Sequence, residues 1–138
     1  MKKIELLAGR LRQELREDGR WDVVRRFGVS IDGEEFWIPE GFDHDGSSWP
    51  RGVPGPRQRR IMIAGAVHDW ACRYATHGEG GRPLSYMEAN RLWYHVSLGG
   101  KHKDAKANKF WAWVGRIGLF AGCLPTWIRY RKADASAV

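Results

Sequence analysis

The sequence predicts one α+β domain that is mainly helical, with a small antiparallel β-hairpin packed at one side. Three segments carry apolar residues at helical spacing, and one stretch alternates apolar and polar residues around an Asp-Gly pair. The chain has 138 residues, of which 43% are hydrophobic, so it can form one domain with a sizeable core. We assign residues 1–132 to this domain and residues 133–138 to a polar tail.

The N-terminal third is predicted to contain one short helix followed by the hairpin. Residues 5–17 have the pattern of a helix that ends at Asp18-Gly19. Asp32-Gly33 is a strong signal for a two-residue hairpin turn. Apolar residues alternate with polar ones on both sides of this turn: Val29, Ile31, Phe36 and Ile38. Pro39 is expected to end the second strand, and residues 41–56 contain four glycines and three prolines, which is typical of a loop.

The rest of the chain is predicted to form three main helices. The first covers residues 57–75 and has an apolar face made by Ile63, Val67, Trp70 and Tyr74. The second covers residues 85–98, and Ser85 with Glu88 has the spacing of a capping box at its start. The third covers residues 105–122, and Pro125 is expected to end it.

An apolar run, residues 110–124, lies largely within the third predicted helix. It is fifteen residues long and contains Arg116, whereas a membrane-spanning helix needs about 20 apolar residues. We expect a buried helix in which Trp111 or Trp113, together with Phe120, packs against the helix that carries His68. A segment that lies on a membrane surface is the alternative.

Charge and cysteine content limit the classes of partner. The net charge of +7 and the pI near 9.8 favour polyanions, but no nucleic-acid motif accompanies the basic residues, so we expect only non-specific binding. Cys72 and Cys123 lack the CxxC spacing of a thiolate zinc site, and we expect free thiols. The N-terminus lacks the apolar segment of a signal peptide. A cytoplasmic protein without a membrane partner is the expectation.

A few polar residues stand beside apolar sequence and are candidates for a site. His68 follows Gly65 by one turn and borders the apolar face of the first helix, so it is either a catalytic histidine or a hydrogen-bonded core residue. Asp69 could serve chemistry or pair with Arg73 on the helix surface. Asn90 falls on the apolar face of the second helix and needs hydrogen-bond partners there.

Three motifs follow one another along the chain: FWIPEGFDHDGSSWPR, AGAVHDWACR and LSYMEANRLWY. Together they resemble a phage and prophage family, domain of unknown function family 1353, and the resemblance covers about residues 36–127. The family signature is an extended segment ending in a proline and Gly-Phe, a Thr-Asp-Gly-x-Ser-x-Pro loop, a helix with His-Asp and a helix with an acidic-Ala-Asp run. By position, the resemblance implies that Asp45 and Ser48 are the loop residues and that His68 and Asp69 are the helix pair.

This chain departs from the family signature at two positions. His44 replaces the threonine before the loop aspartate, and Asn90 replaces the aspartate of the second helix. An amide in place of a carboxylate weakens a site for a hard cation. If the family site binds a divalent metal, the expected ligands here are His44, Asp45 and His68.

Two function classes remain open from the sequence. In the first, a phage- or prophage-type accessory protein binds a virion component, a host protein or a polyanion, in the host cytoplasm or on the virion, and Ser48 and Asn90 belong to a structural polar network. In the second, Asp45, His68 and Asp69 are the catalytic residues of a hydrolase that uses a metal or a His-Asp general base. We expect Asp45 and His68 within hydrogen-bond range in either class. Asn90→Asp separates the classes, because the binding class predicts destabilisation without any gain in chemistry.

Overall fold

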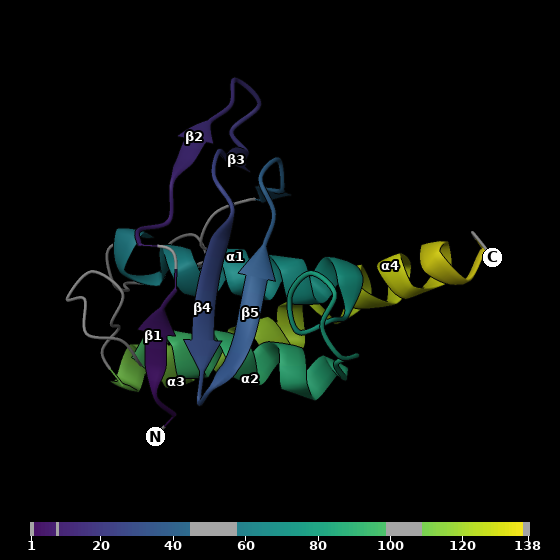
Figure 1. The fold of residues 1–138 in the computed structure, drawn as a ribbon. Helices are drawn as coiled ribbons and strands as arrows, with labels where there is room; N and C mark the ends of the chain where they lie inside the picture. Colours follow the sequence, from purple (N-terminus) through teal and green to yellow (C-terminus); the bar gives the residue numbers. More distant parts are fainter. Residues whose placement is uncertain (1, 8, 45–57, 99–108, 137–138) are drawn as a thin grey trace.

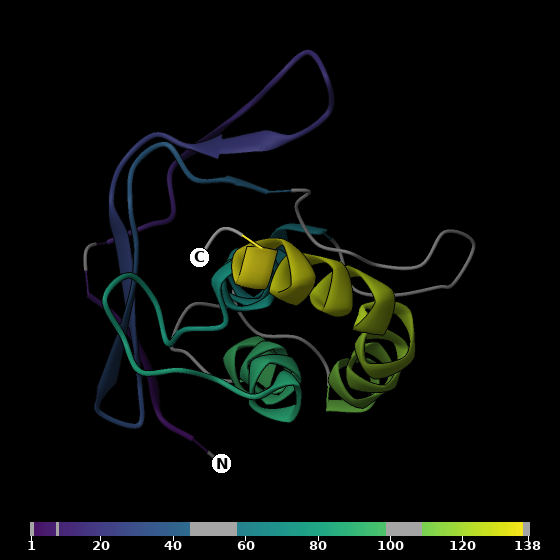
Figure 2. The ribbon, with the colours of Figure 1, turned by 90° about the vertical axis from the view of Figure 1, so that its right-hand side faces the viewer.

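The computed structural model describes residues 2–7, 9–44, 58–98 and 109–136 as a small α+β domain. Its four described helices are α1 (Gln58–Tyr74), α2 (Tyr86–Leu98), α3 (Lys109–Gly122) and α4 (Leu124–Ser136). One three-stranded sheet lies across α1 and α2, and α3 lies on the side of α2 away from that sheet (Figure 1; Figure 2). The domain is therefore layered, with α1 and α2 in the middle.

The sheet over the helices has the strand order β1 (Ile4–Leu6), β4 (Phe27–Ile31) and β5 (Glu34–Ile38), all antiparallel. The β4–β5 pair is the predicted hairpin. Asp32 and Gly33 have φ angles of 55° and 87°, which is the left-handed backbone that a tight hairpin turn requires. The four apolar residues predicted from the alternation are almost completely buried: Val29, Ile31, Phe36 and Ile38. Phe27 at the start of β4 is buried as well.

The predicted helix at residues 5–17 is wrong. This stretch contains β1 and β2 (Gln13–Leu15) instead, and Gly9 between them has a φ of 77°. Ile4 pairs with Ile31 and is buried, so tertiary pairing outweighs a local preference for helix. β2 begins a second antiparallel sheet with β3 (Trp21–Val23) and β6 (Asp43–His44).

Helices α1 and α2 run in opposite directions and pack closely under the first sheet (Figure 1). Their buried residues supply half of the core, chiefly Val67, Trp70, Leu92, Trp93 and Val96. The predicted capping box is confirmed: the Glu88 amide donates to Ser85 Oγ at 3.2 Å, and the Ser85 amide donates to Glu88 Oε1 at 3.4 Å. This cap fixes the start of α2 and thereby the position of Asn90 one turn later.

The C-terminal part differs from the prediction in two ways. Pro125 lies in the first turn of α4, where its missing amide hydrogen costs little, and the helix continues through Ser136 into the expected polar tail.

Trp113 and Phe120 are 54% and 50% exposed, so the prediction of burial against α1 is wrong for both. α3 packs chiefly against α2 through one side, which includes the buried Gly115. The side chain of Trp111 lies outside the described part.

No helix within the described ranges is both long enough and apolar enough to cross a lipid bilayer.

Candidate functional site

His68 on α1 and Asn90 on α2 form a buried polar pair between the two helices. His68 Nε2 lies 3.0 Å from Asn90 Oδ1, and the two residues are each 3% exposed. Helical spacing places His68 beside the apolar face of α1, and the antiparallel packing of α2 brings Asn90 opposite to it. The expectation that Asn90 needs a hydrogen-bond partner is met by His68.

This pair sets the protonation of His68. Burial lowers the pKa of His68, and the hydrogen bond with Asn90 opposes that shift. The ring is therefore neutral at neutral pH. With the amide oxygen of Asn90 facing Nε2, that nitrogen must carry the proton, since a carbonyl oxygen only accepts. The lone pair of His68 then resides on Nδ1.

His68 Nδ1 faces the carboxylate of Asp69. The distance from Nδ1 to Asp69 Oδ1 is 4.0 Å, and a second histidine, His44, places its Nδ1 at 3.9 Å from Asp69 Oδ2. These separations exceed a direct hydrogen bond but suit a bridging water. His44 ends β6 and is 1% exposed, with its Nε2 2.7 Å from Gln13 Oε1. Asp69 is thus flanked by two buried imidazoles.

Asp69 connects this buried group to a cavity of about 410 Å³. The Asp69 side chain is 19% exposed, in contrast to the buried histidines. Two ion pairs border the cavity, Arg20–Asp43 at 2.6 Å and Arg73–Asp134 at 3.1 Å. The remaining wall includes Phe42, Cys72, Tyr74, Thr126 and Tyr130.

Cys72 is one turn beyond His68 and also lines the cavity. Burial raises the pKa of this thiol to about 11, so it is protonated at neutral pH and a poor nucleophile. Cys72 and Cys123 are both free, as expected. The chemistry of the cavity therefore centres on Asp69 and the imidazoles behind it.

The predicted site residues are only partly within the described ranges. Asp45 and Ser48 lie outside them, so the expected contact between Asp45 and His68 lies outside as well. The described residues hold no group of three or more His, Cys, Asp or Glu side chains that could bind a metal. Of the expected ligands, His68 is next to Asp69 on α1 and His44 approaches Asp69 from β6. Asp69 itself was not an expected ligand.

Sequence reasoning missed the part of the site that comes from the N-terminal strands. Gln13 orients His44, and Arg20 pairs with Asp43 at the cavity rim. Both contacts depend on the second sheet, but the sequence predicts a helix over β2 and a loop over β6. No local signal in the sequence connects Gln13 with His44, because they are 31 residues apart.

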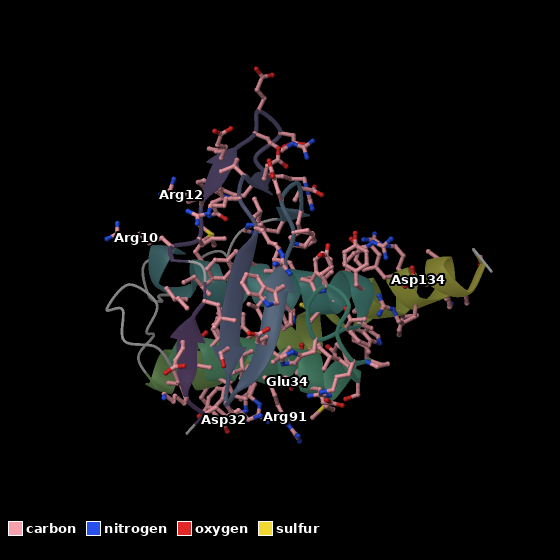
Figure 3. The ribbon with its side chains drawn as sticks, viewed as in Figure 1. Arg10, Arg12, Asp32, Glu34, Arg91 and Asp134 are labelled. Carbon is pink, nitrogen blue, oxygen red and sulfur yellow. The ribbon has the colours of Figure 1, made fainter. Side chains whose placement is uncertain are left out.

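A second polar cluster lies at the hairpin end of the molecule, where Figure 3 shows Glu34 and Arg91. His77 Nε2 lies 3.2 Å from Glu34 Oε1, and Arg82 bridges Glu34 and Glu88 at 2.7 Å each. His77 Nδ1 donates to the Glu35 carbonyl at 3.0 Å. These bonds attach the loop between α1 and α2 to β5, so the cluster has a structural role.

The chain matches a model of a known protein family. A family model described as a protein of unknown function, DUF1353, matches residues 21–114. This range contains β3 to α2 and the first part of α3, and so includes His44, His68, Asp69 and Asn90. No curated protein and no solved structure matches the chain. The match covers more than half of the sequence, and the chain belongs to the domain of unknown function family 1353.

Proposed function

We propose that the protein is a hydrolase in which His68 acts as the general base on a water molecule. The observation that carries the proposal is the 3.0 Å contact between His68 Nε2 and Asn90 Oδ1. It holds the imidazole with its lone pair on Nδ1, the nitrogen that faces Asp69, and it is Asp69 that lines the cavity. A general base needs this combination of fixed orientation and a neutral ring at the working pH.

The reaction would be attack of water on an ester or amide carbonyl. A water placed between His68 Nδ1 and Asp69 loses a proton to Nδ1 as its oxygen bonds to the carbonyl carbon. The tetrahedral intermediate then collapses, the bond to the leaving oxygen or nitrogen breaks, and the imidazolium returns its proton to the leaving group. Asp69, at 4.0 Å, stabilises the positive charge that His68 carries between the two steps.

Asn90 and Asp69 have supporting roles in this scheme. Asn90 fixes the imidazole without adding charge, so its tautomer is set while the pKa stays low. The aspartate that the family signature has at this position would add an electrostatic attraction for the imidazolium. Asp69 supplies such a charge from the neighbouring position on α1, closer to the cavity.

A hydrolysis assay on chromogenic substrates tests the proposal. p-Nitrophenyl esters of increasing acyl length and p-nitroanilides of single amino acids cover both bond types. Activity is expected in the wild type and His95→Gln, and a loss in His68→Gln. His95 is a matched control, because it is a half-buried histidine on α2 that lines a different cavity, the one beside Glu34, His77 and Arg82. Equal rates in all three proteins would contradict the role of His68.

A binding module is the second candidate, and it is favoured by a different observation. Large apolar side chains on α3 and α4 are exposed, and basic residues lie among them. Partners of this module in a phage or prophage setting would be a virion component, a host protein or a polyanion. Binding to a polyanion would be non-specific and would weaken steeply between about 50 and 200 mM salt. A salt-resistant, sequence-selective complex would contradict that form of the proposal.

A further inference from the structure

We infer that the exposed face of α3 and α4 docks the protein on the surface of an anionic phospholipid membrane. The α3–α4 apolar face, as we name it, consists of Trp113, Ile117, Phe120, Leu124 and Ile128. These side chains are between 42% and 54% exposed. Trp113, Ile117 and Phe120 are spaced by four and three residues, which forms a stripe along α3, and Leu124 and Ile128 are four residues apart on α4, which follows directly.

The stripe is larger than a scatter of single exposed residues. The other exposed large apolar residues of the described chain include Leu15 on β2, Tyr74 on α1 and Met87 on α2, which belong to three different elements. On α4 the stripe continues into a groove of about 520 Å³ lined by Leu124, Pro125, Ile128, Arg129 and Lys132. A contiguous apolar patch with a polar rim marks an interaction surface.

The rim of this face is basic. Arg129 and Lys132 border the groove on α4. Asp134 is the acidic residue of α3 and α4, and it pairs with Arg73 at 3.1 Å and with Arg131 at 3.4 Å. The charge that this face presents is therefore positive.

This combination fits an anionic bilayer better than a second copy of the chain. A symmetric dimer through the same face would place one positively charged surface against another, which is repulsive. At a bilayer surface the apolar side chains enter the boundary between headgroups and acyl chains, and arginine and lysine contact the phosphates. Tryptophan is favoured at that boundary, and Trp113 is the most exposed side chain of the face.

Vesicle sedimentation tests the inference with the full chain. The probes are vesicles of phosphatidylcholine alone and of phosphatidylcholine mixed with phosphatidylglycerol. Wild type is expected to sediment with the anionic vesicles and about tenfold less with the neutral ones. The double variant Ile117→Ser with Ile128→Ser should lose about tenfold in binding, because both side chains belong to the apolar face. Leu15→Ser is the matched control, since Leu15 is 61% exposed on β2 and should bind as wild type does.

Charge variants separate the basic rim from general attraction to the net positive protein. Arg129→Glu with Lys132→Glu is expected to reduce binding to anionic vesicles at least fivefold. Arg10→Glu with Arg12→Glu changes the net charge equally, and Figure 3 shows both arginines pointing outward near the N-terminal strands. Equal losses in the two charge variants would overturn a specific docking face.

Two further results would overturn the inference. One is failure of wild type to bind anionic vesicles at about 50 mM salt, where electrostatic attraction is strong. The other is a wild-type dimer in light scattering that Ile117→Ser with Ile128→Ser converts to a monomer, because the face would then be a contact between copies. Neither result bears on His68, whose test is hydrolysis of soluble substrates.

Discussion

The α1–α2 pair buries polar side chains, whereas the α3–α4 pair exposes apolar side chains. Between α1 and α2, polar His68 and Asn90 are almost completely enclosed. On α3 and α4, five large apolar side chains remain 42–54% exposed. Each arrangement costs free energy relative to an apolar interior with a polar surface. The stability of the fold explains neither arrangement, so both are candidates for function.

The two pairs also differ in how their cost is offset. His68 Nε2 satisfies Asn90 Oδ1 by a hydrogen bond next to the core, whereas Asn90 Nδ2 is buried without a hydrogen-bond partner among the described residues. The α3–α4 apolar face has no such compensation within the described part of the chain. A buried polar pair therefore indicates a chemical role at one site, whereas an exposed apolar stripe indicates a surface that a partner covers.

The largest expected effect is on hydrolysis by His68→Gln. Glutamine keeps a polar side chain opposite Asn90 but has no basic nitrogen, so general-base catalysis is lost. The rate constant kcat should fall by about 10²–10⁴-fold, with the thermal midpoint changing little by comparison. Steady-state kinetics and thermal unfolding on the same preparations measure both. A fall in stability that fully accounts for lost activity would leave His68 as a core residue only.

A pair of tryptophan variants tests the comparison through stability. Trp93 on α2 is 3% exposed, whereas Trp113 on α3 is 54% exposed. Trp93→Ala should cost about 3–5 kcal/mol of unfolding free energy, because a core cavity remains. Trp113→Ala should cost less than about 1 kcal/mol. Urea unfolding of the two proteins gives the difference, and similar losses would show that the exposed face is covered in solution.

The variant Asn90→Asp tests how the side chain at residue 90 controls the protonation of His68. A carboxylate beside His68 should raise the pKa of that imidazole, because it attracts the imidazolium. At pH 8, where His68 is neutral, the buried charge should cost about 1–3 kcal/mol. The loss should shrink toward pH 6, since a folded-state pKa raised above the unfolded one contributes stability at low pH that disappears as pH rises. Thermal midpoints at both pH values, with Asn90→Ala alongside, measure this.

The same variant also tests the divalent metal that the resemblance suggested. Midpoints of Asn90→Asp are compared with and without calcium or magnesium. We expect no stabilisation by metal, because His68 occupies the position that faces residue 90. Stabilisation that occurs only with metal would instead favour a metal-dependent hydrolase. Its absence is expected both of a binding module and of a hydrolase without metal, and the His68→Gln assay separates those two.

The sequence predicted those elements whose signals are local. The hairpin follows from Asp32-Gly33 between two alternating runs, and the start of α2 follows from Ser85 and Glu88. The helical positions of His68 and Asn90 follow from periodicity, so both were candidates, although their direct contact was not predicted. The structure supplies that contact through the packing of α1 on α2.

The missed features depend on contacts between distant segments. Residues 5–17 have helical propensity, but pairing of Ile4 with Ile31 gives β1 a place in the core. The apolar run in α3 predicted burial because composition does not reveal how many sides of a helix have neighbours. α3 uses one side against α2, so Trp113 and Phe120 remain exposed.

The smallest expected effect is the pH dependence of wild-type stability. Burial is the main cause that lowers the pKa values of His68, His77 and His95. As pH falls through about 6.5, these histidines bind protons in the unfolded chain but not in the folded chain. Their contribution to the free energy of unfolding is therefore present above about pH 6.5 and is lost as pH falls below it. Each histidine contributes at most about 1.4 kcal/mol per pH unit.

Chemical denaturation between pH 7.5 and 5.5 measures this slope, because the carboxylates with lowered pKa values, Glu34, Asp43 and Glu88, titrate below that window. His68→Gln should flatten the slope more than His95→Gln, since His68 is the more deeply buried. Helices α3 and α4 contain no histidine, so vesicle binding through their apolar face should stay nearly constant over the same range. A binding affinity that follows the histidine titration would mean that the buried pair and the exposed face are coupled and cannot be treated as separate regions.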